Sequence, residues 1–368
     1  MRTRTRHWSF IATLASAAAV LASCGSSSTN SSSGGSAFDI TSYKAAVAQF
    51  AGNVQWNGPT TPAKAPAAEK AFVVACTDAL EGCRLVKEGV QHALTDLKWE
   101  QHTQVVDDPA AYSAAMQNAL NQNATIVFLV GIQQEIVSGP LAQAHASHIP
   151  VVSVAQYNKA GPGGVDVESS PDGPTEGKAI ADAMIVNNNG KVDAQFLADA
   201  EFGLPVATLA GRKELGTCAP CKIEPDINFI ASEIQTALPT RVTAALQAHP
   251  NINSVLVGYD PPIAVLAPAI DNIGSGKTVK LYTQLGTSGA LKFLRTNDVL
   301  IADIVEPEDW NGYAAVDEGI RLLNGMSLVQ ENLPIKMLTK DNVPPEGQPY
   351  TGDGVNYQSK YHALWGIA

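Results

Sequence analysis

Four cysteines have the type and spacing that redox or metal chemistry would require. Cys218 and Cys221 are separated by two residues, as in thiol–disulfide exchange motifs, and Cys76 and Cys83 form a second close pair. A redox motif of this kind opens a helix that follows a strand, whereas Cys221 leads into a predicted strand. Zinc would need a second ligand pair at suitable spacing, and the sequence offers none. We therefore expect disulfides; among three connectivities we favour Cys76 with Cys83 and Cys218 with Cys221.

Two glycine-rich segments resemble catalytic motifs without completing them. The run from Gly274 to Thr278 resembles the end of a phosphate-binding loop, but Asp271 stands where that motif needs glycine. The run from Gly286 to Gly289 lacks the residue that a nucleophile elbow places between its serine and its second glycine. The seven histidines show no metal-binding spacing. We therefore predict no catalytic residue, no metal and no cofactor.

Polar and aromatic residues follow the predicted strands, where open α/β sheets bind their ligands. Each of them has a structural alternative, because such residues also cap helices or, like Trp310, fill cores. The candidate ligand-binding residues are Thr77, Asp78, Asp107, Gln133, Gln134, Gln156, Tyr157, Phe202, Tyr259, Asp260, Gln284, Glu306 and Trp310.

The elements that would position these residues alternate between apolar runs and amphipathic stretches. Predicted strands cover 71–75, 104–106, 125–129, 150–154, 194–197, 222–224, 254–257, 279–282, 300–304 and 335–338. Predicted helices cover 85–97, 112–120, 136–146, 174–186, 206–215, 241–248, 263–273, 290–294 and 310–324. Continuously apolar strands that alternate with helices predict parallel sheets covered on both faces, with right-handed crossovers. We therefore expect an α/β fold of two doubly wound parallel-sheet lobes.

The N-terminus has the order of features of a bacterial lipoprotein signal. Arg2, Arg4 and Arg6 precede an apolar stretch at 8–21, which ends in Leu21-Ala22-Ser23-Cys24. The stretch has signal-peptide length and is short for a membrane span. We expect cleavage before Cys24, lipidation of that cysteine, and a flexible Ser/Gly/Asn tether at 25–36. An exported chain with four further cysteines also favours disulfides.

The charge of the mature chain disfavours nucleic acid as a partner. Loss of the signal removes three arginines and leaves 21 basic residues against 35 acidic ones, a net charge of −14. Such a surface repels phosphate backbones. We therefore expect no nucleic-acid partner.

Several segments, in the right order, resemble the type I periplasmic binding proteins of the ribose- and galactose-binding class. They are Leu85 to Val90, Ser147 to Val152, Leu246 to Val255, Gly312 to Gly325 and Tyr361 to Gly366, within a resemblance that covers roughly 70–338. The resemblance implies a three-segment hinge, a ligand cleft between the lobes, and a monomer that delivers a small molecule to ABC permease subunits. A lipid anchor would hold such a protein at the outer face of the membrane, beside its permease.

The residues that clamp sugars in that family are largely absent. Gly82 and Cys83 stand in place of two aromatic residues, and Gln133-Gln134 in place of an acidic residue and an arginine. The other departures are Thr208 for an arginine, Tyr259-Asp260 for Asn-Asp, Leu285 for an aspartate and Glu306 for a glutamine. The cleft should therefore be less basic and more aromatic, with an unpaired carboxylate. It suits a ligand with hydrogen-bond donors, a positive charge or an apolar body, although a sugar or polyol is the family's commonest case.

The expected organisation places the signal at 1–23 and the lipidated cysteine, tether and lead-in at 24–69. Lobe 1 comprises 70–155 and 308–333, lobe 2 comprises 166–305, and a last hinge strand and tail occupy 334–368, with a crossing expected near Gly161 to Gly164. Two alternatives remain open at this point. One is a sensory protein that presents its ligand to a membrane receptor, and the other is an exported α/β enzyme.

Overall fold

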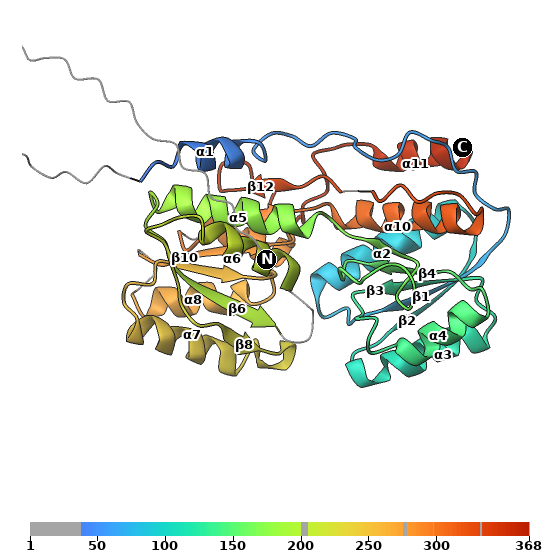
Figure 1. Cartoon of the computed structure of the whole chain (residues 1–368), viewed down its shortest axis with the longest axis horizontal. Coiled ribbons are helices and arrows are strands. Elements are labelled where there is room, and N and C mark those ends of the chain that lie inside the picture. The colour runs from blue at the N-terminus through green and yellow to red at the C-terminus, as the bar shows by residue number, and fades with distance from the viewer. Residues whose placement is uncertain (1–37, 200–204, 275–277, 297, 332, 368) are drawn as a thin grey trace, which may run out of the picture. The chain divides into compact units, whose positions relative to one another are not determined.

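Three largely apolar runs in the first half of the chain form the centre of a five-stranded sheet (Figure 1). The computed structural model describes residues 38–199, 205–274, 278–296, 298–331 and 333–367. The sheet has the order β2-β1-β3-β4-β5, and all its neighbours pair in parallel. Its strands are β1 (Lys70–Ala75), β2 (Glu100–Val105), β3 (Ile126–Val130), β4 (Val151–Val154) and β5 (Val167–Ser169).

Helices cover both faces of this first sheet, because successive strand residues point to opposite sides. Val73 and Phe128 pack in one core with α2 (Glu81–Asp96) and α10 (Glu308–Leu323). Val74 and Leu129 face the opposite core, with α3 (Tyr112–Asn121) and α4 (Ser138–Ala146). A one-turn 3₁₀ helix, Pro109–Ala111, precedes α3. We call this sheet and its helices lobe 1.

The second half of the chain forms a seven-stranded sheet with the order β12-β11-β10-β9-β6-β7, while β8 also pairs with β6. All its pairs are parallel except β12 with β11. The strands are β6 (Asp193–Asp199), β7 (Lys222–Ile223), β8 (Ile227–Phe229), β9 (Ser254–Val257), β10 (Lys280–Gln284), β11 (Leu300–Val305) and β12 (Lys336–Leu338).

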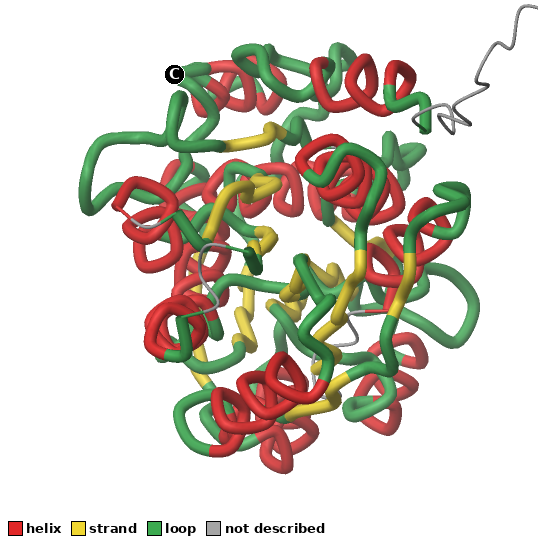
Figure 2. The backbone as a smooth tube through the Cα atoms, turned by 90° about the vertical axis from the view of Figure 1, so that its left-hand side faces the viewer, coloured by secondary structure: helices red, strands yellow, loops and turns green. Residues whose placement is uncertain are grey.

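This second sheet also lies between two helical layers, as the end-on view shows (Figure 2). On one face lie α1 (Thr41–Ala48), α5 (Gly173–Asn187) and α6 (Pro205–Leu215). On the other lie α7 (Ala237–Ala248), α8 (Ile263–Asn272) and α9 (Ser288–Thr296), with a 3₁₀ turn at Ala231–Glu233 before α7. We call this part lobe 2. The predicted α/β fold of two doubly wound lobes is confirmed.

The first crossing between lobes differs from the predicted one. Because β5 pairs with β4, the chain stays in lobe 1 as far as Ser169 and crosses just before α5. The segment around Gly161 to Gly164 is a loop closed by a bridge between Ala160 and Val165. A three-residue strand gives too short a pattern to recognise in sequence, whereas a Gly-Pro-Gly-Gly run is conspicuous.

Two later crossings follow β11 and α10, and the terminal segments also link the lobes. The chain passes from β11 into α10, which returns to lobe 1, and then back to β12 in lobe 2. The lead-in runs from Val54, in a lobe 2 core, to Ala63, in a lobe 1 core. At the other end α11 (Tyr357–Trp365) packs beside α10.

An ion pair centred on the buried Lys336 joins these linking segments. The ammonium of Lys336 donates to Asp353 Oδ1 at 2.7 Å and to Asn53 Oδ1 at 3.1 Å. The other oxygen of Asp353 accepts the backbone N–H of Val54 at 2.8 Å. One carboxylate thus ties the lead-in, β12 and the C-terminal segment together.

Both favoured cysteine pairs are disulfide-bonded in the structure, Cys76 with Cys83 and Cys218 with Cys221. Cys24, the predicted lipidation site, lies outside the described residues. Within the described part of the chain, no helix combines the length and apolar character needed to cross a bilayer.

Candidate functional site

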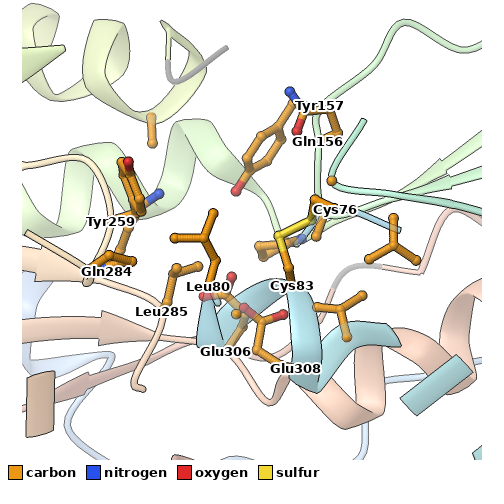
Figure 3. Close-up of a pocket in the computed structure, with 18 residues that line it drawn as sticks. Cys76, Leu80, Cys83, Gln156, Tyr157, Tyr259, Gln284, Leu285, Glu306 and Glu308 are labelled. Atoms are coloured by element: carbon orange, nitrogen blue, oxygen red, sulfur yellow. A yellow bond between two sulfur atoms is a disulfide. The ribbon is translucent and has the colours of Figure 1, made fainter. Parts of the chain in front are cut away.

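A cavity of about 100 Å³ lies between the lobes, where the carboxyl ends of both sheets meet (Figure 3). A single water needs roughly 10–15 Å³ on this measure, so the space suits a small molecule. Lobe 1 supplies Cys76, Leu80, Gly82, Cys83, Val86, Val130, Gly131, Ala155, Gln156, Tyr157 and Glu308. The crossing segment supplies Pro171, and the lobe 2 part of the chain supplies Ala207, Tyr259, Pro261, Gln284, Leu285 and Glu306.

A single carboxylate on β5 positions Gln156 and Tyr157. Glu168 Oε1 accepts the backbone N–H groups of Gln156 at 3.0 Å and Tyr157 at 2.9 Å, and its Oε2 accepts that of Asn158 at 3.1 Å. These bonds hold the loop after β4 with Tyr157 at a φ of 58°. The Tyr157 hydroxyl then donates to Glu176 Oε2 at 2.8 Å, so the ring lies across the first crossing.

Asp260 holds the lobe 2 wall of the cavity in place through hydrogen bonds to the two threonines that flank it. Its Oδ1 accepts the hydroxyl of Thr283 at 3.0 Å, and its Oδ2 accepts both the N–H and the hydroxyl of Thr287 at 2.7 Å. Gln284 and Leu285 lie between these two threonines and line the cavity. Burial is the main cause that raises the pKa of Asp260, to about 7. Asp260 is therefore a positioning residue and does not contact the cavity.

Tyr259 is oriented by two lobe 2 partners. Its hydroxyl donates to Asp199 Oδ2, and its ring stacks on Phe229 with centroids 6.1 Å apart. Figure 3 shows Tyr259 and Tyr157 on opposite sides of the cavity. The cavity thus has one aromatic wall from each lobe.

Three carboxylates gather where the chain passes between the lobes. Glu306 follows β11, Glu308 opens α10, and Glu176 is in the first turn of α5. All three are almost fully buried, and the carboxyl groups of Glu306 and Glu176 influence each other electrostatically. One oxygen on each has no hydrogen-bond partner, namely Oε2 of Glu306, Oε2 of Glu308 and Oε1 of Glu176.

The electrostatic consequence is a set of raised pKa values. Burial is the main cause for Glu306 and Glu308, and repulsion by Glu176 adds to it, so the pKa of each lies well above its usual range. Burial likewise raises the pKa of Glu176 to about 7. Lysine, arginine and histidine are absent from the described residues that line the cavity.

The Cys76–Cys83 disulfide forms part of the lobe 1 wall, beside the first turn of α2 (Figure 3). It packs directly on Gly131, whose φ is 63° and where an added Cβ would lie 2.4 Å from Cys76 Sγ. Glycine is therefore required at 131 both by its backbone conformation and by the sulfur.

Five predicted site residues meet at the cavity: Gln156, Tyr157, Tyr259, Gln284 and Glu306. Thr77 and Asp107 instead bond to each other at 2.7 Å, and Asp78 pairs with Lys87 at 2.5 Å. Gln133 does not line the cavity, and Gln134 accepts the backbone N–H of Val165 at 3.1 Å. Phe202 lies outside the described residues.

Trp310 has a core position and lies outside the cavity. It stacks between Trp56 and Tyr357, with centroids 5.4 Å and 5.1 Å away. Its indole N–H donates to the hydroxyl of Tyr361 at 3.2 Å. The lead-in and α11 supply these partners, and both are far from Trp310 in sequence.

Sequence reasoning missed Glu308 and most of the apolar wall. Glu308 reads as an acidic residue in the first turn of a helix, where carboxylates are common for electrostatic reasons. Leu80, Val86 and Leu285 have the same composition as core residues, so nothing local marks them. The one available signal was at Gly82 and Cys83, which replace bulky residues of sugar-binding relatives.

The side chains that line the cavity can form hydrogen bonds and apolar contacts with a small molecule. The described lining residues include no serine, threonine, histidine or lysine that could serve as a nucleophile or as its activating base. No cluster of three potential metal ligands occurs among the residues that the structure describes. What the cavity does offer is carboxylates, two amides and two aromatic rings within an apolar enclosure.

The chain is similar to proteins of known family and structure. Residues 71–327 match the family model described as periplasmic binding protein domain. No curated protein matches the chain in a sequence search. An ABC sugar transporter subunit from Rhodobacter sphaeroides is 16% identical, with a TM-score of 0.68 over 74% of this chain and 99% of that one.

Two further solved structures share the fold. An ABC transporter solute-binding protein from Burkholderia graminis, in complex with D-arabinose, is 15% identical, with a TM-score of 0.68 over 78% of this chain and 99% of its own. The 5-methylthioribose transporter solute-binding protein from Thermotoga lettingae, in complex with 5-methylthioribose, is 17% identical. Its TM-score is 0.64 over 77% of this chain and 89% of its own. Both of these proteins are described as solute-binding proteins of ABC or related transporters. The family model spans more than half of the chain, which therefore belongs to the periplasmic binding protein family.

Proposed function

We propose that the protein is the extracytoplasmic solute-binding component of an ABC importer. It captures a small polar molecule between its lobes and presents the closed form to permease subunits. The observation that carries the proposal is the cavity at the carboxyl ends of both sheets, to which both lobes contribute polar side chains. The solved neighbours described as transporter subunits support the same role.

Closure of the lobes over the solute is part of this proposal. Gly82 and Leu285 face each other across the cleft, and an added Cβ on Gly82 would lie 3.3 Å from Leu285 Cδ1. Contacts of this kind form only when the lobes are together. A solute that touches both lobes favours that state, and the crossings before α5, before α10 and before β12 supply the hinge.

The mature protein is held at the membrane by lipid on Cys24 and acts as a monomer. The support is the order of charged, apolar and Leu-Ala-Ser-Cys segments at the N-terminus. A lipid anchor keeps the binder close to the permease and leaves the lobes free to open and close.

A thermal-shift screen of the purified protein against sugars, polyols, amines and aromatic solutes tests the function. A solute that binds only the folded state raises the melting temperature. We expect at least one such solute, bound once per chain and recovered without chemical change. Gln284→Leu should weaken its binding about tenfold, while Gln143→Leu, on an exposed face of α4, should not. If no small solute binds, or if the solute is converted to a product, the proposal fails.

A further inference from the structure

The unpartnered oxygens of Glu306 and Glu308 point to the chemistry of the solute. Both side chains are less than a tenth exposed, and both line the cavity. Oε2 of each is buried without a hydrogen-bond partner. Figure 3 shows the two carboxylates side by side at one end of the cavity. A buried acceptor without a donor is costly, so a bound molecule that donates to both oxygens would relieve that cost.

Among the described residues that line the cavity, no cationic side chain compensates these carboxylates. The groups that act on Glu306 and Glu308 from the surrounding elements are themselves acidic or phenolic, namely Glu176 on α5, Asp303 on β11, Asp260 after β9 and Tyr157 after β4. The described lining residues contain no lysine, arginine or histidine. A bound molecule is therefore the source from which a counter-charge would come.

The cavity walls also suit a cation. The rings of Tyr157 and Tyr259 line the cavity from opposite sides. An ammonium group is attracted to the face of a tyrosine ring, and more strongly where water is excluded. The remaining walls, including Leu80, Val86 and Leu285, are apolar and fit a short carbon skeleton.

We propose that the solute carries a protonated amine, which Glu306 and Glu308 bind between the rings of Tyr157 and Tyr259. The inference rests on the proposed function and specifies its substrate class as small amino polyols or amino alcohols. The rival chemistry is a neutral polyol, to which the same two residues would donate as protonated carboxylic acids.

The two chemistries differ in the sign of their pH dependence. The pKa values of Glu306 and Glu308 are raised by burial and by like charges, so these side chains hold their protons to a higher pH than an exposed glutamate does. An ammonium ligand favours the ionised carboxylates, so its binding releases protons and tightens as pH rises. A neutral polyol needs the protonated carboxyls as donors, and its binding weakens as pH rises.

Calorimetric titration of the full-length protein with matched amine and hydroxyl compounds tests the inference. The pairs are 2-amino-1,3-propanediol with glycerol, 1-amino-1-deoxysorbitol with sorbitol, and 5-aminopentanol with 1,5-pentanediol. We expect at least one amine to bind about tenfold or more tightly than its hydroxyl partner at pH 8. That amine should bind more tightly at pH 8 than at pH 6. A hydroxyl partner that binds as tightly, or affinity that falls over this interval, overturns the inference.

Amide substitutions separate a charge effect from a packing effect. Glu306→Gln and Glu308→Gln keep the side-chain shape, and each should lower amine affinity about tenfold while changing the affinity of the hydroxyl partner much less. Glu318→Gln is the matched control, because Glu318 is a buried glutamate on the same helix as Glu308 but lies outside the cavity. Melting curves check that each variant folds. Equal losses for amine and hydroxyl compounds would contradict the assignment.

Different results would contradict the inference and the proposed function on which it rests. If sugars or polyols bind and the amines do not, the inference is wrong and the solute-binding function stands. If neither the three pairs nor the wider solute screen gives binding, both are wrong.

Discussion

Glu81 of lobe 1 and Ser288 of lobe 2 are hydrogen-bonded across the cleft. Glu81 Oε1 accepts the backbone N–H of Ser288 at 3.1 Å, and its Oε2 accepts the serine hydroxyl at 3.0 Å. Glu81 opens α2 and Ser288 opens α9, so the carboxylate of one helix caps the N-terminus of the other. This contact exists only while the lobes are together.

Replacing Glu81 should therefore weaken ligand binding without touching the cavity wall. A hydrogen bond to a charged group contributes about 1 kcal/mol at a partly exposed site, so Glu81→Gln should lower affinity about fivefold. Glu88→Gln is the control, because Glu88 also lies on α2 but pairs with Arg84 of the same helix. Calorimetry with the solute that raises the melting temperature most would measure both. Equal affinities would show that this bridge does not stabilise the closed form.

The ligand-free protein should lose stability as pH rises, because of Glu306. Its pKa is raised well above the ordinary 4.5 by burial and by repulsion from Glu176 and Glu308. The folded chain therefore keeps a proton that the unfolded chain releases above pH 4.5. The stabilisation is complete below that pH and is lost as pH rises through the folded-state pKa.

Glu306→Gln should flatten this dependence. Each retained proton contributes a slope of about 1.4 kcal/mol per pH unit to the free energy of unfolding. Between pH 5 and pH 8 the wild type should thus fall more steeply than Glu306→Gln, which should be the more stable form at pH 8. Denaturant titrations at several pH values give both curves. Parallel curves would mean that Glu306 ionises freely in the folded chain.

Gly131→Ala should destabilise the protein strongly. The new Cβ would lie 2.4 Å from Cys76 Sγ at a φ of 63°, so both the wall of the cavity and the disulfide must shift. We expect a loss of about 3 kcal/mol. Gly163→Ala has a similar φ, 83°, but meets nothing within 4 Å, and should cost only about 1 kcal/mol. Similar losses at the two positions would show that backbone conformation alone requires Gly131.

The positions of the strand ends were predictable from sequence, but which side chains at those ends face the cavity was not. Gln156, Tyr157, Tyr259, Gln284 and Glu306 reach the cavity because parallel strands deliver their carboxyl ends to one edge. Asp260 has the same place in the pattern, yet Thr283 and Thr287 turn its carboxylate into the sheet. Which of two adjacent polar residues faces the ligand depends on such local bonds.

Trp310 and Glu308 show a second limit of prediction from sequence, which concerns the direction in which helix residues point. They lie two residues apart on one helix, so their side chains point away from the helix axis in different directions and have different surroundings. Sequence favoured the aromatic residue, whereas the structure puts the glutamate at the cavity and the tryptophan against Trp56. The partners that decide this come from the lead-in and the C-terminal helix, which no local pattern could place.

The ion pair between Lys336 and Asp353 should stabilise the fold measurably. Their side chains are 4% and 14% exposed, and Asp353 also accepts the N–H of Val54. Asp353→Asn tolerates the φ of 54° at this position but leaves the buried ammonium without its charge partner, at a cost of about 3 kcal/mol. Asp341→Ala, at an exposed position, should change the unfolding free energy by less than about 0.5 kcal/mol. Chemical denaturation of both variants tests this, and an unchanged Asp353→Asn midpoint would contradict it.

A crystal structure of the complex with the tightest-binding solute tests the central claim most directly. We predict one solute molecule enclosed between the lobes, in contact with Tyr157, Gln284 and Glu306. A solute bound elsewhere on the protein, with this cavity unchanged, would contradict the account.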